Sequence, residues 1–209
     1  AAAALKMILF FALAMMSVPL ILGVAIDGGA TWQSILVIEG ALALVVAAIL
    51  AFVPLLDVTG RRNIRSSQLK QVFSHDYKLL LGMMGAGFAY VGAEMTANVW
   101  LPKFQIDAFA ARDTLASLSV PLFWVGLIAG RLLVMALSRR YSPSRLLLVC
   151  AVTFAVFAVA VAAARSQAAS LVLAVGAGLG ASASYGIIGS YAGGFPGWQS
   201  GVASSLFVL

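Results

Sequence analysis

The chain has 209 residues and a net charge of +6, with 63% hydrophobic and only 10% charged residues. Soluble domains use roughly 45–50% apolar and about 25% charged residues, so this composition, with a mean hydropathy of +1.05, excludes a soluble globular protein. It indicates a polytopic membrane protein. The basic residues lie between the apolar runs, where they report membrane orientation and not a nucleic acid partner.

Apolar runs long enough to cross a bilayer recur along the chain, because about 20 apolar helical residues span a hydrocarbon core of ~30 Å. We therefore expect an all-α fold. The predicted spans are Leu5–Ala25, Gln33–Val53, Leu79–Leu101, Thr114–Ser138, Leu146–Ala164, Ala168–Tyr191 and a truncated span from Gly201. Both ends of the chain look cut, so we interpret the sequence as a fragment.

Basic residues are unevenly shared between the two sides of the membrane that alternating spans define. Segments 54–78 and 139–145 carry five and three Lys or Arg residues, whereas 26–32, 102–113 and 165–167 carry none, two and one. By the positive-inside rule the first set is cytoplasmic. Residues 54–78 are predicted to form a solvated linker between two membrane halves.

Three polar residues recur at every fourth position of the third span. Tyr90, Glu94 and Asn98 therefore share one helical face. Glu94 lies in mid-span, where an ionisable group costs at least ~2.5–3.5 kcal/mol on insertion scales and usually faces a partner or a watery cavity. The stripe predicts a cavity lining, and a hydrogen-bonded Glu94 at a helix contact is the alternative.

Two rows of small residues predict close contacts between membrane helices. One row lies beside the polar stripe, at Gly85, Ala89, Ala93 and Ala97. The other lies in the span from Ala168, at Gly178, Ser182, Gly186 and Ser190, with Tyr185 on an overlapping face.

Other residues within the spans have alternative readings. Arg131 lies about two turns before Arg139 and Arg140, and is predicted to snorkel to the cytoplasmic interface or to pair with another helix. Trp124 lies seven residues before Arg131 on the same face, which predicts either a cavity lining or a lipid contact. Glu39 is predicted to be structural, reaching water or a neighbouring helix.

The sequence indicates no cofactor and no metal site. Cys150, the only cysteine, lies in an apolar run and is predicted to pack, while His75 has no metal-ligand partners at motif spacing. The glycines of residues 176–180 lack the preceding strand that a phosphate-binding loop requires. Pro19 and Pro121 lie within spans and predict kinks.

Two spans, a long basic linker and further spans form a layout that resembles the major facilitator superfamily, from the fifth to the eleventh of twelve spans. Two kinds of motif carry the resemblance. The first is similar to the basic cytoplasmic turn of the family: Gly130-Arg131, Leu137-Ser138-Arg139-Arg140-Tyr141 and Arg145. The second resembles the seventh and tenth spans of the fucose permease-like branch: Tyr90-Val91-Gly92-Ala93-Glu94 and Gly180-Ala181-Ser182 with Tyr185.

The resemblance implies a partial fold of two helical bundles. Residues 1–53 correspond to the last two helices of the first bundle, 54–78 to the central cytoplasmic loop, and 79–209 to an incomplete second bundle. It also implies that the seventh and tenth spans line a central cavity, while the sixth and ninth lie at the periphery.

The site expected from the stripe and the resemblance together contains two groups of residues. The substrate-binding candidates are Tyr90, Glu94, Asn98, Trp124, Ser182 and Tyr185, with Glu94 as the proton-coupling group. The gating candidates at the cytoplasmic turn are Gly130, Arg131, Arg139 and Arg140.

The predicted function is that of a secondary active transporter, not an enzyme, that moves a small polar, sugar-like solute by alternating access in the plasma (inner) membrane. Protons, the solute and the lipid bilayer are the expected partners. A multidrug or metabolite exporter of the same superfamily is the first alternative, since an aromatic cavity with one acid suits lipophilic cations. An integral-membrane enzyme would need clustered His, Asp or Glu, which the sequence lacks; a non-transporting scaffold or receptor is a further alternative.

Overall fold

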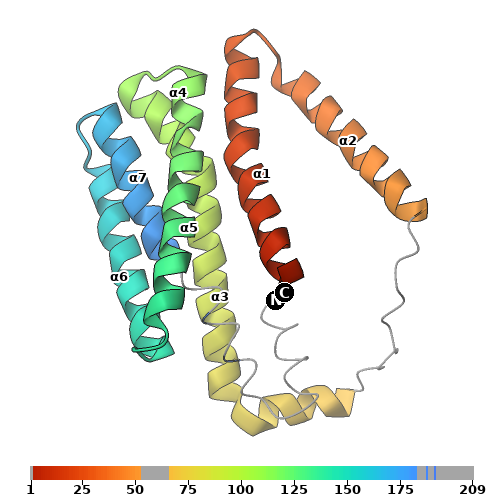
Figure 1. Ribbon diagram of the computed structural model, residues 1–209, viewed down its shortest axis with the longest axis vertical. Coiled ribbons are helices and arrows are strands. Elements are labelled where there is room, and N and C mark those ends of the chain that lie inside the picture. Colours follow the sequence, from red (N-terminus) through yellow and green to blue (C-terminus); the bar gives the residue numbers. More distant parts are fainter. Residues whose placement is uncertain (1, 53–65, 183–186, 188–190, 192–209) are drawn as a thin grey trace.

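The computed structural model describes residues 2–52, 66–182, 187 and 191, with side chains from residue 14 onward apart from those of residues 50 and 66–76. Over these residues the regular structure is entirely helical, as predicted (Figure 1). The helices are α1 (Ala2–Asp27), α2 (Trp32–Phe52), α3 (Ser66–Phe109), α4 (Asp113–Ser117), α5 (Ser119–Leu137), α6 (Pro143–Ala162) and α7 (Gln167–Ala181).

Several of these helical segments are long and apolar enough to cross a membrane. They are Trp32–Ile49, Tyr77–Phe109, Asp113–Leu137 and Pro143–Ala162, with shorter apolar helices at Ala14–Asp27 and Gln167–Ala181. The predicted spans thus coincide with helices throughout the described part of the chain. Residues 183–186 and 188–190 of the sixth predicted span, which include Tyr185, Gly186 and Ser190, lie outside the described residues, as does the span expected from Gly201.

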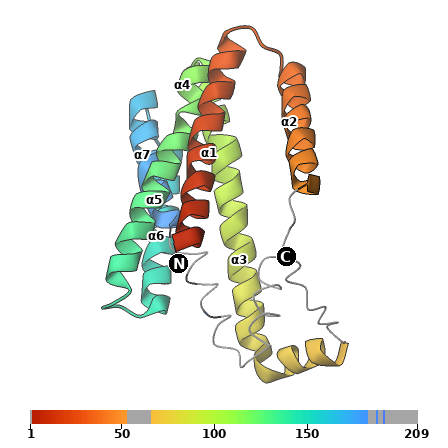
Figure 2. The same ribbon diagram turned by 45° about the vertical axis from the view of Figure 1, so that its right-hand side comes forward.

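The third helix is much longer than the span predicted at Leu79–Leu101. It runs from Ser66 to Phe109 over 44 residues, roughly twice the length needed to cross a ~30 Å hydrocarbon core. Its first part runs across the base of the molecule before the helix joins the bundle (Figures 1 and 2). The second half of the expected linker 54–78 is therefore helical, and residues 54–65 lie outside the described residues.

The fourth predicted span is interrupted near its start. The first segment, α4, ends at Ser117 and α5 begins at Ser119, with Leu118 between them. Pro121 causes this interruption because it has no N–H to donate to the carbonyl of Ser117. Helix α5 thus begins close to Pro121, whereas Pro19 lies inside the continuous helix α1. The kinks expected at the two prolines stay predictions.

The connections between helices alternate between the two ends of the bundle. The α1–α2, α3–α4 and α6–α7 turns lie at one end, and the α5–α6 turn lies at the other with the first part of α3 (Figure 1). This is the alternation that the orientation prediction assumes. At the end with fewer basic residues, Lys103 pairs with Asp107 of the same helix at 2.8 Å.

Close backbone contacts place α7 between α5 and α6. A Cβ at Gly178 of α7 would overlap the carbonyl oxygen of Phe123 in α5, and a Cβ at Gly126 of α5 would overlap the carbonyl oxygen of Val175 in α7. On the other side of α7, Gly180 packs on the backbone of Phe154 in α6. The close contact predicted for the small residues of this helix is therefore confirmed at Gly178.

The other row of small residues does not make the predicted helix contact along its length. Gly85 and Ala89 of α3 are exposed, and a Cβ at Gly85 would meet nothing within 4 Å. Ala97 alone packs against the buried core. Among the described residues, the predicted contact is therefore confirmed at Ala97 and not at Gly85.

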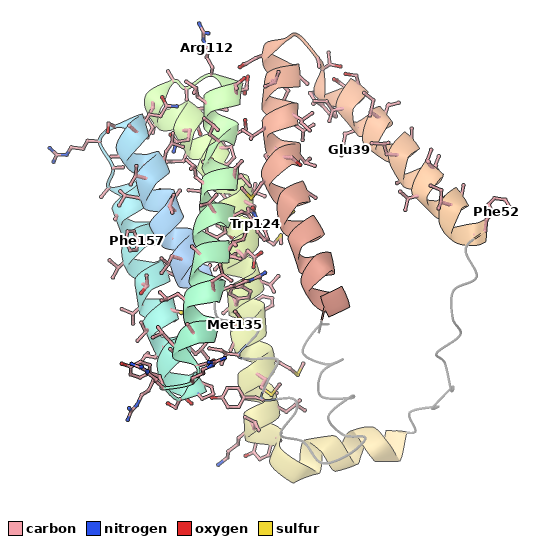
Figure 3. All side chains as sticks on the ribbon, viewed as in Figure 1. Glu39, Phe52, Arg112, Trp124, Met135 and Phe157 are labelled. Atoms are coloured by element: carbon pink, nitrogen blue, oxygen red, sulfur yellow. The ribbon has the colours of Figure 1, made fainter. Side chains whose placement is uncertain are left out.

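Helix α2 lies apart from the other helices in both views (Figures 1 and 2). None of its Trp32–Ile49 segment is buried against the described chain. Glu39 is exposed on this separate helix (Figure 3), and not in contact with a neighbouring helix. Cys150, by contrast, is buried with Leu146 and Ile187, which confirms it as a packing residue.

The α5–α7 contact predicts a large difference between two glycine substitutions. Gly178→Val should destabilise the protein by about 1–3 kcal/mol or more, since its side chain must displace the backbone of α5. Gly85→Val is the matched control in another membrane helix, and should have little effect because no described residue lies within 4 Å of the added Cβ. Unfolding of the purified protein in detergent would compare them, and equal destabilisation would contradict the contact.

Candidate functional site

The polar stripe predicted on the third span lies at a buried part of α3. Tyr90 and Glu94 are each only 8% exposed, and Asn98 is partly buried. All three belong to the segment Tyr77–Phe109 that is long enough to cross the membrane. The stripe is therefore confirmed as a buried polar face, while its role in binding stays a prediction.

A chain of hydrogen bonds fixes the side chain of Asn98. The indole Nε1 of Trp124 in α5 donates to Asn98 Oδ1 at 2.8 Å, and Asn98 Nδ2 donates to the carbonyl oxygen of Glu94 at 2.8 Å. The oxygen and the nitrogen of the Asn98 side-chain amide are thus both hydrogen-bonded. The main-chain carbonyl of Asn98 does not receive the usual hydrogen bond from the residue four positions later, because that residue is Pro102.

Trp124 is a core residue and not a lipid-facing one. Its side chain is 0% exposed and packs in the main buried cluster with Tyr90, Phe123 and Leu127 (Figure 3). The alternative of a lipid contact is therefore wrong. Full burial also means that Trp124 acts on the stripe through its hydrogen bond to Asn98.

Arg131 belongs to the same polar group, across the α3–α5 contact. The carboxyl of Glu94 and the guanidinium of Arg131 both interact electrostatically with the buried phenol of Tyr90. Arg131 is partly buried and lies near Tyr90 of α3. Its two predicted roles, reaching the cytoplasmic interface and pairing with another helix, both stay predictions. Tyr90 connects an acid on its own helix with a base on α5.

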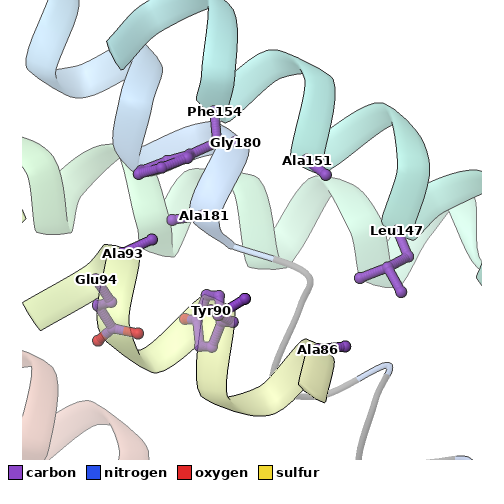
Figure 4. Close-up of a pocket in the computed structure, with 10 residues that line it drawn as sticks. Ala86, Tyr90, Ala93, Glu94, Leu147, Ala151, Phe154, Gly180 and Ala181 are labelled. Carbon is purple, nitrogen blue, oxygen red and sulfur yellow. The ribbon is translucent and has the colours of Figure 1, made fainter. Parts of the chain in front are cut away.

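A pocket of about 310 Å³ adjoins the stripe. It lies between α3, α6 and α7, and small apolar residues form most of its wall (Figure 4). The lining residues are Ala86, Ala89, Tyr90, Ala93, Glu94, Leu147, Ala151, Phe154, Gly180 and Ala181. Three of them come from α6, the helix that was expected to lie at the periphery.

The side chains at the pocket leave α3 in different directions. Ala93 points toward Ala181 of α7, whereas the carboxylate of Glu94 points to the other side of α3 (Figure 4). Glu94 therefore contributes to the pocket wall while its charged group is directed away from α7. Tyr90 lies one turn earlier on the same wall.

The remaining predicted residues fall into a packing contact and an exposed turn. Ser182 is buried against Gly130, because a Cβ at Gly130 would overlap the Ser182 hydroxyl. Gly130 is therefore a contact point between α5 and α7, and not part of the turn. Arg139 and Arg140 are exposed in the α5–α6 turn.

Gln105 is a buried polar residue that the sequence reasoning missed. It is 0% exposed, and its Nε2 donates to the hydroxyl of Ser170 in α7 at 2.8 Å. Its Oε1 has no hydrogen-bond partner among the described residues. Gln105 lies seven residues after Asn98, so helical spacing continues the polar stripe to this position, a signal that the sequence did contain.

The described residues contain no group of three or more His, Cys, Asp or Glu side chains placed to hold a metal ion. A sequence model described as the Major Facilitator Superfamily matches residues 3–209. The chain belongs to the major facilitator superfamily. No curated protein and no solved structure gave a match.

Membership of the superfamily accounts for the general nature of the site. The superfamily consists of membrane transporters, which implies a transporter rather than an enzyme. The resemblance to the fucose permease-like branch stays a prediction.

The hydrogen bond between Trp124 and Asn98 predicts energetic coupling between the two residues. In a double-mutant cycle with Trp124→Phe and Asn98→Leu, we expect a coupling of about 0.5–1.5 kcal/mol in the free energy of unfolding. Trp100, an exposed tryptophan of α3, supplies the control: Trp100→Phe should be additive with Asn98→Leu. Additivity of Trp124→Phe as well would show that the bond contributes nothing.

Proposed function

We propose that this protein is a secondary active transporter that moves a small polar, sugar-like solute by alternating access, coupled to protons through Glu94. Residues 1–53 and 79–209 would belong to the two bundles that rock about a site near the midplane, with 54–78 joining them. The α5–α6 turn would face the cytoplasm at the plasma (inner) membrane.

Buried Glu94 is the observation that carries this proposal. A carboxyl that is 8% exposed inside a membrane-spanning helix is expensive to retain, and such groups mark ion or substrate pathways. A polar network of Tyr90, Asn98 and Arg131 surrounds it. A proton and a solute that compete for, or share, this network would have their movements coupled.

The other predicted residues take supporting parts in this proposal. Tyr90 would stack on the ring of the solute, and the hydroxyls of Ser182 and Tyr185 would donate to it. Trp124 would hold Asn98 in the orientation that the solute meets. Arg131, Arg139 and Arg140 would act in gating at the cytoplasmic end of the second bundle.

The apolar pocket favours a second candidate, an exporter of lipophilic cations. Tyr90 and Glu94 share the pocket wall with alanines, Leu147 and Phe154. Aromatic faces such as those of Tyr90 and Phe154 attract an organic cation, whereas an apolar wall gives a sugar few hydrogen bonds. This candidate keeps the superfamily and the role of Glu94 but changes the solute.

Proton coupling through Glu94 predicts a specific transport defect. In proteoliposomes with the whole native protein, Glu94→Gln should abolish solute accumulation driven by a proton gradient, because the amide cannot exchange a proton. Movement of solute down its own gradient should persist, since the amide keeps the size of the carboxyl. The control is Glu39→Gln on the separate helix α2, which should accumulate solute normally; unchanged accumulation by Glu94→Gln would rule out the coupling role.

The two candidate solutes predict opposite results in one competition assay. A panel of monosaccharides and cationic dyes should be tested for binding to the purified protein, with Phe154→Ala as the pocket variant. Binding of sugars that is insensitive to Phe154→Ala supports the symporter. Binding of dyes that weakens by about tenfold or more on loss of the aromatic face supports the exporter and contradicts the sugar proposal.

A further inference from the structure

Two glutamine side chains at one end of the bundle carry buried polar atoms that are not paired. Gln105 lies near the end of α3 and is 0% exposed. Gln167 is the first residue of α7, and the α3–α4 and α6–α7 turns lie at the same end of the bundle (Figure 1). Among the described residues, Gln105 Oε1 and Gln167 Nε2 are buried atoms without a hydrogen-bond partner.

Ser170 brings these two glutamines to the same contact between α3 and α7. Its hydroxyl accepts from Gln105 Nε2 at 2.8 Å. It follows Gln167 by one helical turn, so both residues lie on the same face of α7. Ser170 and Ala174, one further turn along this face, are each 0% exposed. The amide of Gln167 therefore lies beside the contact that the amide of Gln105 makes.

We propose that a water molecule binds between α3 and α7 at this point, where it donates to Gln105 Oε1 and accepts from Gln167 Nε2. The two glutamines and the water form what we call the α3–α7 water site. The proposal does not depend on which solute the protein moves. It makes a bound water a structural component of the contact that holds the polar stripe of α3.

The chemistry of the two unpaired atoms selects water as the ligand. Gln105 Oε1 can only accept a hydrogen bond, and Gln167 Nε2 can only donate one. A buried amide atom without a partner costs free energy, and ordered water commonly satisfies such atoms in protein interiors. Water both donates and accepts, and it is small enough to fit between two packed helices. A bridge of this kind is nearly as favourable as a direct hydrogen bond.

The position of Gln105 favours a bridge over a direct bond between the two amides. The amide group is planar, so the bond from Nε2 to Ser170 also restricts the direction of Oε1. A shift that brought Oε1 onto Gln167 would distort that bond, whereas a water reaches both atoms with the side chains in place. Gln167 is only partly buried as a residue. The site therefore lies at the edge of the core, where water can enter from the end of the bundle.

Magnetisation transfer from water to glutamine side-chain amides tests the site. The whole native protein would be deuterated, labelled with 15N-glutamine and embedded in lipid nanodiscs. The effect is measured in the rotating frame, where its sign separates a nearby water from chemical exchange. We expect a strong transfer to the amide protons of Gln167. Gln33, which is exposed on α2, should show only the weak transfer from surface water.

Gln105→Met removes the acceptor of the site while keeping the length of the side chain. The transfer to Gln167 should then be lost, because the water no longer has its second partner. Ser170 keeps its hydroxyl in this variant, so a signal relayed from that hydroxyl would survive. Gln33→Met is the matched control and should leave the transfer to Gln167 unchanged. If Gln105→Met does not fold, loss of the transfer to Gln105 in Gln167→Met gives the same test.

Unfolding in detergent measures whether the two glutamines share one partner. Gln105→Met and Gln167→Met should each lower the folding equilibrium constant by about fivefold or more, because each leaves a buried polar atom unpaired. The double variant should lose no more than the larger single loss, since it removes both atoms. The α3–α7 water site would be overturned by additive losses, by a transfer to Gln167 no stronger than that to Gln33, or by a transfer that survives Gln105→Met.

Discussion

The arrangement of this protein depends on the approach of α7 to its two neighbours at glycine. In lipid, hydrophobic burial gives no net attraction between helices, so association relies on close packing and hydrogen bonds. Gly126 and Gly178 let the backbones of α5 and α7 touch, and Gly180 does the same for α7 and α6. Any side chain at Gly126 or Gly178 would push against a carbonyl oxygen and not against a movable rotamer. These contacts make α5, α6 and α7 a unit on which α3 can be placed.

The polar groups of α3 are held by that unit at two levels. Near the middle of the helix, Trp124 reaches from α5 to Asn98; further along, Ser170 of α7 accepts from Gln105. Each bond satisfies a group that would otherwise cost free energy in an apolar interior. The pair of bonds fixes the rotation of α3, because a turn of the helix about its axis would break both. Glu94 lies on the helix segment whose orientation is fixed in this way.

Composition and hydropathy were sufficient to predict the helical fold, the positions of most helices and the alternation of the turns, because the bilayer permits few other solutions. The stripe of Tyr90, Glu94 and Asn98 was predictable for the same reason, since helical spacing determines which residues share a face. The boundaries of the helices were harder to predict from the sequence. Hydropathy identifies apolar runs, so it could not predict that the polar first part of α3 is helical.

The sequence pattern could not predict which residues on different helices contact each other. Spacing placed Trp124 and Arg131 on one face, but it could not say whether that face met lipid or α3. The structure shows that both meet α3, since Trp124 bonds to Asn98 and Arg131 acts on Tyr90. Gly130 illustrates the same limit: its neighbours in sequence suggested a turn motif, whereas its neighbours in space are Ser182 and Leu179. Pairwise contacts of this kind depend on helix rotation, which a periodic pattern leaves free.

The contrast between two glycine contacts explains how one chain can contain both a rigid unit and a separable boundary. At the α5–α7 contact, glycines on both helices meet opposing backbone, and Trp124, Phe123 and Leu127 of α5 are fully buried beside them. Between α1 and α4, Gly23 meets the buried Ser117, and the exposed Asp27 accepts hydrogen bonds from Thr114. About two turns earlier in α1, Met15 and Met16 pack against the main core. Separation at α1–α4 therefore exposes groups that water can satisfy, whereas separation at α5–α7 would expose a packed core and strand the Trp124 indole. If the protein rocks as proposed, these two surfaces favour a motion at α1, with α5, α6 and α7 moving as one body.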